Sequence, residues 1–235
     1  MTIHQQRRDL VFLILGSIFL TNALVAELIG GKLFSLGPFT MSMGVLGWPI
    51  VFITTDLVNE YFGKQGVRRL TLITVGMIIF TFILLAVAMR IPAVSFSPIQ
   101  DEPFRNVFGQ SQWIIVGSIS AFMASQLIDV LVFWFFRNKT GTKMLWLRAT
   151  GSTAVSQLID TFIVLGIAFW LPGILRDQLG LFTEALKGAS VFTTEEFLKV
   201  STSNYTYKLI IAVTLTPIIY LAHDAIDKYF AFREL

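Results

Sequence analysis

A five-residue sequence, Ser-Gln-Leu-Ile-Asp, occurs twice in the chain, at residues 125–129 and again at residues 156–160. In each copy the Gln and the Asp stand three positions apart, a spacing that places both side chains on one face of a helix. A carboxylate accepts hydrogen bonds, and an amide both donates and accepts them. Two such faces turned toward each other would be able to hold a small polar solute between them.

The composition indicates which elements must position these faces. Of the 235 residues, 54% are hydrophobic and only 14% are charged, and the mean hydropathy is +0.71. Soluble domains carry about 25% charged residues, so the composition predicts a polytopic protein embedded in a lipid bilayer. The net charge of +3 is small, which disfavours nucleic acid as a partner. The absence of cysteine excludes a disulfide framework.

The apolar residues gather into six stretches about as long as a helix needs to cross roughly 30 Å of hydrocarbon. They predict one all-α domain, residues 1–235, built as a bundle of six transmembrane helices. The second stretch is the least regular because it contains Gly44, Gly47 and Pro49, and residues 35–40 before it could form a short re-entrant or interfacial piece. The first is full length, which favours an uncleaved helix over a signal peptide. The expected spans are residues 10–29, 41–58, 70–89, 113–136, 149–171 and 209–226.

Basic residues flank these spans on one side. With six spans, all the basic groups next to the short loops and the termini fall on the same side, which the positive-inside rule assigns to the cytosol. Both termini are therefore expected in the cytosol. On the opposite side, Thr193 and Glu196 have the spacing of a capping box and predict a short amphipathic helix before the last span. The basic residues are Arg7, Arg8, Lys64, Arg68, Arg69, Arg137, Lys139, Lys143, Arg148, Lys228 and Arg233.

Polar residues inside the apolar spans mark a candidate site. At 1.5 Å per residue, Asp56 and the Gln and Asp of both repeats lie about 12–18 Å from the cytosolic face. Because a charge in hydrocarbon costs about 2.5–3.5 kcal/mol, this set indicates a polar cavity for a solute or an ion. The structural alternative is that the amides and carboxylates only join neighbouring helices. The candidate substrate-binding residues are Asn22 and Glu27 toward the outer side, with Asp56, Glu60, Gln126, Asp129, Gln157 and Asp160.

Several kinds of chemistry have no support in the sequence. His4 and His223 are the only histidines, so a histidine-based metal site is not expected. No metalloprotease, nucleotide-binding or serine-hydrolase motif occurs, and we expect neither an enzyme nor a cofactor. A proton or cation channel stays open as an alternative, although an ion path does not need matched amides. An intramembrane enzyme is a further alternative, but it would need a catalytic group that the sequence does not display.

A set of short motifs resembles those of a known family. The motifs are residues 48–52, 55–57, 60–63, 68–69, 120–124, 126–129, 152–153, 160–161 and 207–208. They are specific as a set and weak singly. Through these motifs the chain resembles, over most of its length, the queuosine precursor transporters of the vitamin uptake transporter group.

This resemblance implies a six-span protein of the bacterial inner membrane that looks similar to the substrate-binding components of energy-coupling-factor transporters, with no evident dedicated energising module. It implies import of deazaguanine precursors of queuosine, such as 7-cyano- and 7-aminomethyl-7-deazaguanine. Carboxylates could accept the N–H and amine donors of the guanine-like edge, and Trp48 or Phe52 could stack on the ring. Another small vitamin-like heterocycle stays open as the substrate. A stripe of small residues, Gly117, Ala121 and Ser125, is expected to let the helices of the two repeats pack closely, and it could alternatively serve a homodimer.

Overall fold

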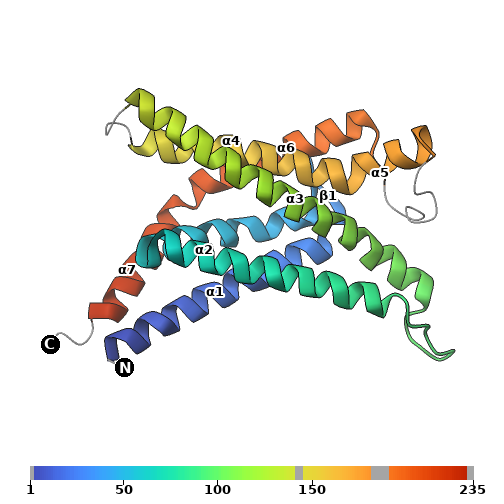
Figure 1. Ribbon diagram of the computed structural model, residues 1–235, viewed down its shortest axis with the longest axis horizontal. Helices are drawn as coiled ribbons and strands as arrows, with labels where there is room; N and C mark the ends of the chain where they lie inside the picture. The colour runs from blue at the N-terminus through green and yellow to red at the C-terminus, as the bar shows by residue number, and fades with distance from the viewer. Residues whose placement is uncertain (1–2, 141–144, 181–190, 232–235) are drawn as a thin grey trace.

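The computed structural model describes residues 3–140, 145–180 and 191–231. They are mostly helical, as the sequence predicts, and Figure 1 shows the long helices lying side by side in one bundle. The long helices are α1 (Ile3–Ile29), α2 (Trp48–Ala88), α3 (Asp101–Thr140), α4 (Leu145–Leu165), α6 (Thr194–Thr214) and α7 (Thr216–Ala231). The short elements are strands β1 (Leu33–Leu36) and β2 (Phe39–Ser42), the 3₁₀ turn η1 (Met43–Gly47), the π-helical turns η2 (Gly166–Trp170) and η3 (Ile174–Gln178), and α5 (Leu171–Gly173).

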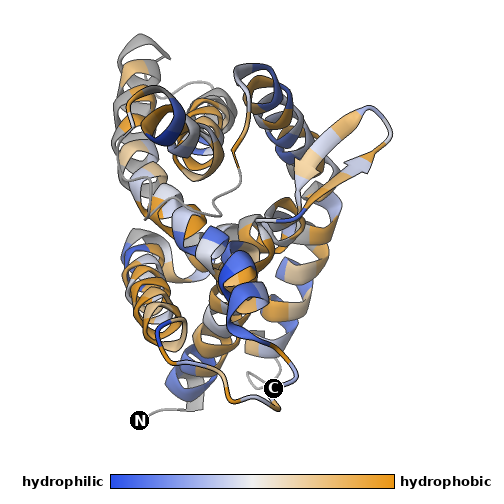
Figure 2. Cartoon of the chain, turned by 90° about the vertical axis from the view of Figure 1, so that its right-hand side faces the viewer, coloured by the Kyte–Doolittle hydropathy of each residue, from blue (hydrophilic) through white to orange (hydrophobic). Residues whose placement is uncertain are grey.

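Within the described residues, three helical segments are long and apolar enough to cross a membrane: Gln5–Ile29, Gln65–Ala88 and Ala154–Asp177. They overlap the first, third and fifth spans expected from the sequence. Many of their large apolar side chains point outward, such as Leu13 (64% exposed) and Leu72 (61% exposed). Figure 2 shows hydrophobic residues along much of the long helices. An apolar surface of this kind is stable in lipid rather than in water, so the chain is a membrane protein.

The expected second span, residues 41–58, is not one helix. Its first two residues end the antiparallel hairpin formed by β1 and β2, which turns at Gly37 and Pro38. The chain then makes η1, and α2 starts only at Trp48, with Pro49 in its first turn. Proline lacks an N–H and is tolerated in the first turn of a helix, where that donor would be unpaired anyway. Residues 35–40 therefore belong to a hairpin rather than to a re-entrant piece.

Helix α2 reverses direction at Gly63, which has φ 62° and ψ −170°. Its first part runs antiparallel to α1: a Cβ at Gly47 would lie 3.1 Å from the Asn22 carbonyl oxygen, and Arg8 Nη2 donates to the Tyr61 carbonyl at 3.0 Å. The second part returns along α1 from Leu70 onward, which lies beside Gly16. Figure 1 shows the two parts passing back along each other. Only glycine adopts this backbone conformation without strain.

The end of the molecule that carries this reversal also carries both ends of the described chain. Arg7 Nη1 donates to the Tyr229 carbonyl at 2.9 Å, and Tyr61 Oη donates to Asp227 Oδ1 at 2.7 Å. Nδ1 of His223 lies 3.0 Å from the same Tyr61 hydroxyl. The start of α1, the reversal in α2 and the later part of α7 are thereby joined at one end (Figure 1).

The expected capping box forms, but the helix that it starts is not short. Thr193 N donates to Glu196 Oε2 at 2.8 Å, and Glu196 N donates to Thr193 Oγ1 at 3.2 Å. From there α6 runs without a break to Thr214. The chain then bends before Pro217, because proline offers no N–H to the carbonyl four residues earlier and its ring clashes with that carbonyl. The expected sixth span is therefore shared between α6 and α7.

Replacing Gly63 by alanine should lower the free energy of unfolding by about 1–3 kcal/mol, because a Cβ is strained at this φ and ψ. Gly76 is a matched control, since it lies in the same helix with no atom within 4 Å of an added Cβ. Gly76→Ala should stabilise by up to about 1 kcal/mol through helix propensity. Denaturant unfolding of both variants in detergent measures the difference. Equal stability of the two would contradict the strained reversal.

The capping box predicts a pH dependence at the start of α6. Two hydrogen bonds from Thr193 hold the pKa of the Glu196 carboxyl below its ordinary value of 4.5. A lowered carboxyl pKa contributes stability above the unfolded value, and that contribution disappears as the pH falls through the folded value. The protection of the amides of residues 194–197 against hydrogen exchange, relative to an unstructured peptide at the same pH, should fall below about pH 4. A Glu196→Gln variant should show a much smaller change, and an identical change in both proteins would refute the assignment.

Candidate functional site

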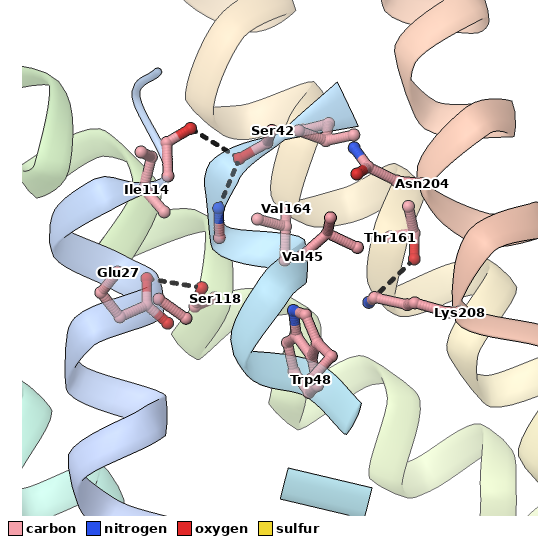
Figure 3. Close-up of a pocket in the computed structure, with 14 residues that line it drawn as sticks. Glu27, Ser42, Val45, Trp48, Ile114, Ser118, Thr161, Val164, Asn204 and Lys208 are labelled. Atoms are coloured by element: carbon pink, nitrogen blue, oxygen red, sulfur yellow. Dashed lines mark hydrogen bonds between the residues drawn. The ribbon is translucent and has the colours of Figure 1, made fainter. Parts of the chain in front are cut away.

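A pocket of about 450 Å³, including its open mouth, lies where α1, η1, the start of α2, α3, α4 and α6 meet (Figure 3). Most of the wall is apolar, with Val45 and Val164 near the middle of the view, and a few polar groups enter from different helices. The lining residues include Glu27, Trp48, Ser118, Thr161, Asn204 and Lys208.

Lys208 places a buried ammonium group in the wall of this pocket. The residue is 5% exposed, and its Nζ donates to Asp160 Oδ2 at 3.1 Å and to Thr161 Oγ1 at 3.1 Å. A longer bond of 3.4 Å reaches Gln157 Oε1. Nζ also lies 4.1 Å from the centroid of the Trp48 ring, in cation–π geometry. The second copy of the repeat therefore binds a cation that belongs to the protein itself.

The bonds from Lys208 of α6 to Asp160 and Thr161 hold α6 against α4. Two further polar residues lie on the same face of α6. Ser201, Asn204 and Lys208 are three and four residues apart, so they share one face of α6. Ser201 is fully buried and Asn204 is 3% exposed. The carbonyl oxygen of the Asn204 amide, Oδ1, has no hydrogen-bond partner in the described part of the chain, and the residue lines the pocket.

Glu27 provides a carboxyl group on another side of the pocket. It is 8% exposed and lies in the last turn of α1. Its Oε2 accepts a hydrogen bond from Ser118 Oγ of α3 at 2.9 Å. No ion pair to Glu27 is found within residues 3–140, 145–180 and 191–231 wherever side chains are described. A carboxylate at a helix C-terminus lacks the support of the helix dipole, so donors from a ligand would stabilise it.

Small residues let the backbone of η1 approach the end of α1 closely, next to Glu27. A Cβ added at Gly44 of η1 would lie 2.9 Å from the Ala26 carbonyl oxygen and 3.4 Å from Gly30 Cα. Ser42 secures the contact, since its Oγ donates to the Gly30 carbonyl at 2.6 Å and accepts from Gly44 N at 3.3 Å. The glycines in the irregular stretch before α2 thus serve to seat η1 against α1 at the pocket.

The structure brings some of the sequence-predicted site residues to this pocket. Glu27 lines it directly, and Gln157 and Asp160 hold Lys208 at its wall. Asn22 is not among the lining residues, because its Nδ2 donates to the Ile18 carbonyl within α1 at 2.8 Å. Glu60 is exposed and lies twelve residues beyond Trp48, about 18 Å along the helix. The side chains of Asp56, Gln126 and Asp129 lie outside the described residues.

Sequence reasoning did not identify Asn204 or Lys208 as site residues. Lys208 stands just before an apolar stretch, where a lysine usually reaches the membrane surface. A signal for both was present: they are four residues apart in a helix whose start is marked by the capping box. Helical periodicity from Glu196 onward would have placed them on one face, and the long helix that carries them was not expected.

Comparison with known proteins gives the family. A family model described as "putative vitamin uptake transporter" matches residues 42–222. The chain belongs to this family. The match covers η1 and most of the pocket-forming helices, and the family is one of transporters rather than enzymes. Membership of a transporter family agrees with the apolar, membrane-embedded helices of the chain.

Two curated relatives of the chain are each named "probable queuosine precursor transporter". The protein of Bacillus subtilis is 29% identical over 199 residues, covering 84% of this chain and 78% of the relative. The protein of Haemophilus influenzae is 25% identical over 224 residues, covering 90% of this chain and 84% of the relative. No solved structure matches the chain significantly.

Replacing Lys208 by methionine should lower the free energy of unfolding by about 3–5 kcal/mol, because it leaves the buried Asp160 carboxylate without its cation. The double variant Lys208→Met with Asp160→Asn removes both charges and should recover most of this loss. Denaturant unfolding in detergent of the single and double variants completes a double-mutant cycle. A double variant as unstable as the sum of the two singles would show that the pair does not interact.

Proposed function

We propose that this chain imports queuosine precursors, 7-cyano-7-deazaguanine and 7-aminomethyl-7-deazaguanine, across the bacterial inner membrane. In this proposal the chain crosses the membrane six times, with both termini in the cytosol, and binds the base in the pocket beside Glu27. Family membership and the printed names of the two relatives support the substrate class. The observation that carries the proposal for this chain is the buried carboxyl of Glu27 in an otherwise largely apolar cavity.

The chemistry of Glu27 matches the guanine-like edge of these precursors. That edge offers a ring N–H and an exocyclic amine side by side, and one carboxylate can accept both hydrogen bonds. The apolar side chains around the carboxyl suit the faces of a flat heterocycle. Lys208 is already paired with Asp160, so the oxygens of the Glu27 carboxyl are available to accept hydrogen bonds from the ligand. An aminomethyl substituent carries a positive charge and would gain further attraction to this site.

The position of the pocket fits loading from outside the cell. Arg7, Arg8, Arg68, Arg69 and Lys228 belong to the end of the molecule where α2 reverses, which the positive-inside rule assigns to the cytosol. Glu27 is twenty residues beyond Arg7 on α1, which is about 30 Å along the helix axis. The pocket would then lie close to the outer surface, beside the β1–β2 hairpin.

The printed family description favours one second candidate, a transporter of another small vitamin-like heterocycle. The same pocket would accept a flat ring with adjacent N–H donors of another kind. A proton or cation channel has less support, because most of the pocket wall is apolar, whereas an ion path is lined by polar or charged groups. Ligand-induced thermal stabilisation across deazapurines, purines and vitamins separates the two importers, since a ligand that binds the folded state raises its melting temperature.

Glu27→Gln should reduce the uptake of labelled 7-cyano-7-deazaguanine by about 10- to 100-fold, the loss expected when a hydrogen-bonding charge is neutralised. The measurement uses cells that lack their own synthesis and uptake of the precursor and carry the transporter. Glu102→Gln is the matched control, because it changes an exposed glutamate in the first turn of α3. Uptake by Glu27→Gln equal to that of the control, at equal membrane levels, would overturn the role of Glu27.

A further inference from the structure

The side-chain amide of Asn204 is a buried hydrogen-bonding group that the described protein does not satisfy. Asn204 is 3% exposed, and its Oδ1 has no hydrogen-bond partner among the residues whose side chains are described. Leaving such an acceptor unpaired is unfavourable, and buried polar groups in native proteins are nearly always paired. Since Asn204 lines the pocket, a ligand in the pocket is a natural source of the missing donor.

Asn204 and Glu27 approach the pocket from different helices. Figure 3 shows Glu27 entering from α1 on one side and Asn204 entering from α6 on the other, with Val45 and Val164 drawn between them. A flat ligand between these two walls would present one polar edge to the carboxyl and a second polar edge to the amide. The apolar valines would then contact the ring itself.

A free deazaguanine base has a second polar edge that suits an amide. In purine numbering, the N9–H of the free base is a donor, and the neighbouring N3 is an acceptor. An asparagine amide carries the complementary pair, because its oxygen accepts and its NH₂ donates. Bidentate pairing of this kind is how Asn and Gln read an adjacent donor and acceptor on a base.

We propose that Asn204 is a specificity-determining residue that binds the N3 and N9–H edge of the free base, opposite the edge bound by Glu27. This assignment rests on the proposed function and identifies what the site excludes. In a nucleoside the sugar replaces the hydrogen on N9, so Oδ1 of Asn204 would stay unpaired in the pocket. The site therefore selects the free base over its nucleoside. A site built to bind an N–H rejects analogues that lack it, because its own buried group is left without a partner.

The test uses the purified full-length protein in detergent and isothermal titration with three probes. These are 7-deazaguanine, 9-methyl-7-deazaguanine and 3,7-dideazaguanine, in which a C–H replaces N3 without a change in shape. The wild type should bind 7-deazaguanine at least about tenfold more tightly than either analogue, the factor that corresponds to one lost hydrogen bond. Asn204→Leu should bind 7-deazaguanine at least about tenfold more weakly and should no longer distinguish it from 3,7-dideazaguanine.

Ser201→Ala is the matched control. Ser201 lies one turn earlier on α6, is fully buried, and also has a hydroxyl without a partner among the described side chains, but it does not line the pocket. Its variant should keep the wild-type order of affinities. Asn204→Leu that still distinguishes the two isosteric probes as the wild type does would overturn the assignment.

If Asn204→Leu does not fold, the affinities of the wild type for the three probes still test the role of Asn204. Equal wild-type affinities for 7-deazaguanine and 3,7-dideazaguanine would overturn the role of Asn204 without any variant. That result would leave the proposed function intact, because the base would still be bound. A wild type that binds none of the three probes would overturn the proposed function, and the assignment of Asn204 with it.

Discussion

The ammonium group of Lys208, buried among oxygens from α4 and a ring from α2, is the interaction on which the site depends. An unpaired charge at this depth would cost several kcal/mol, so the fold must bring its partners together. Asp160, Thr161 and Gln157 supply the oxygens, and Trp48 supplies the aromatic face. Three helices are fixed relative to one another by this one group. The repeated sequence that first suggested a ligand site is, in its second copy, the holder of this cation.

Because Asp160 neutralises Lys208, other polar groups of the pocket must bind a ligand. Glu27 has one hydrogen bond, from Ser118, and Asn204 has an unpaired amide oxygen within the described residues. The remaining walls between them are mostly aliphatic or backbone. A cavity with two polar ends and apolar sides fits a flat solute with hydrogen-bonding groups at opposite edges. Close packing of η1 against α1, made possible by Gly44, keeps Glu27 at the wall.

How much the sequence predicted depends on the kind of signal each residue gives. Glu27 was predictable because a carboxyl inside an apolar stretch is costly and must have a reason. The helical bundle was predictable because the apolar residues gather into stretches long enough to cross a bilayer. The capping box at Thr193 marked the start of α6. Asn22 satisfies itself within α1, which polarity alone does not reveal. A polar residue in an apolar span therefore indicates burial, but its partner decides its role.

Other features were not predictable because they depend on contacts far apart in the chain. Helical periodicity places Lys208 on the face of Asn204, but it does not reveal the partners of the ammonium group, because these precede Lys208 by about fifty residues. The hairpin before η1 was missed because an apolar stretch of that length also fits part of a span. The reversal at Gly63 requires a positive φ, and a glycine in a sequence indicates only that such a φ is allowed.

An experimental structure of the protein with 7-deazaguanine bound tests the central claim most directly. We predict that the base lies between α1 and α6, with its N1–H and amine edge within hydrogen-bond distance of the Glu27 carboxyl and with Lys208 still paired with Asp160. A base bound elsewhere in the bundle, with the space beside Glu27 filled by side chains, would contradict it.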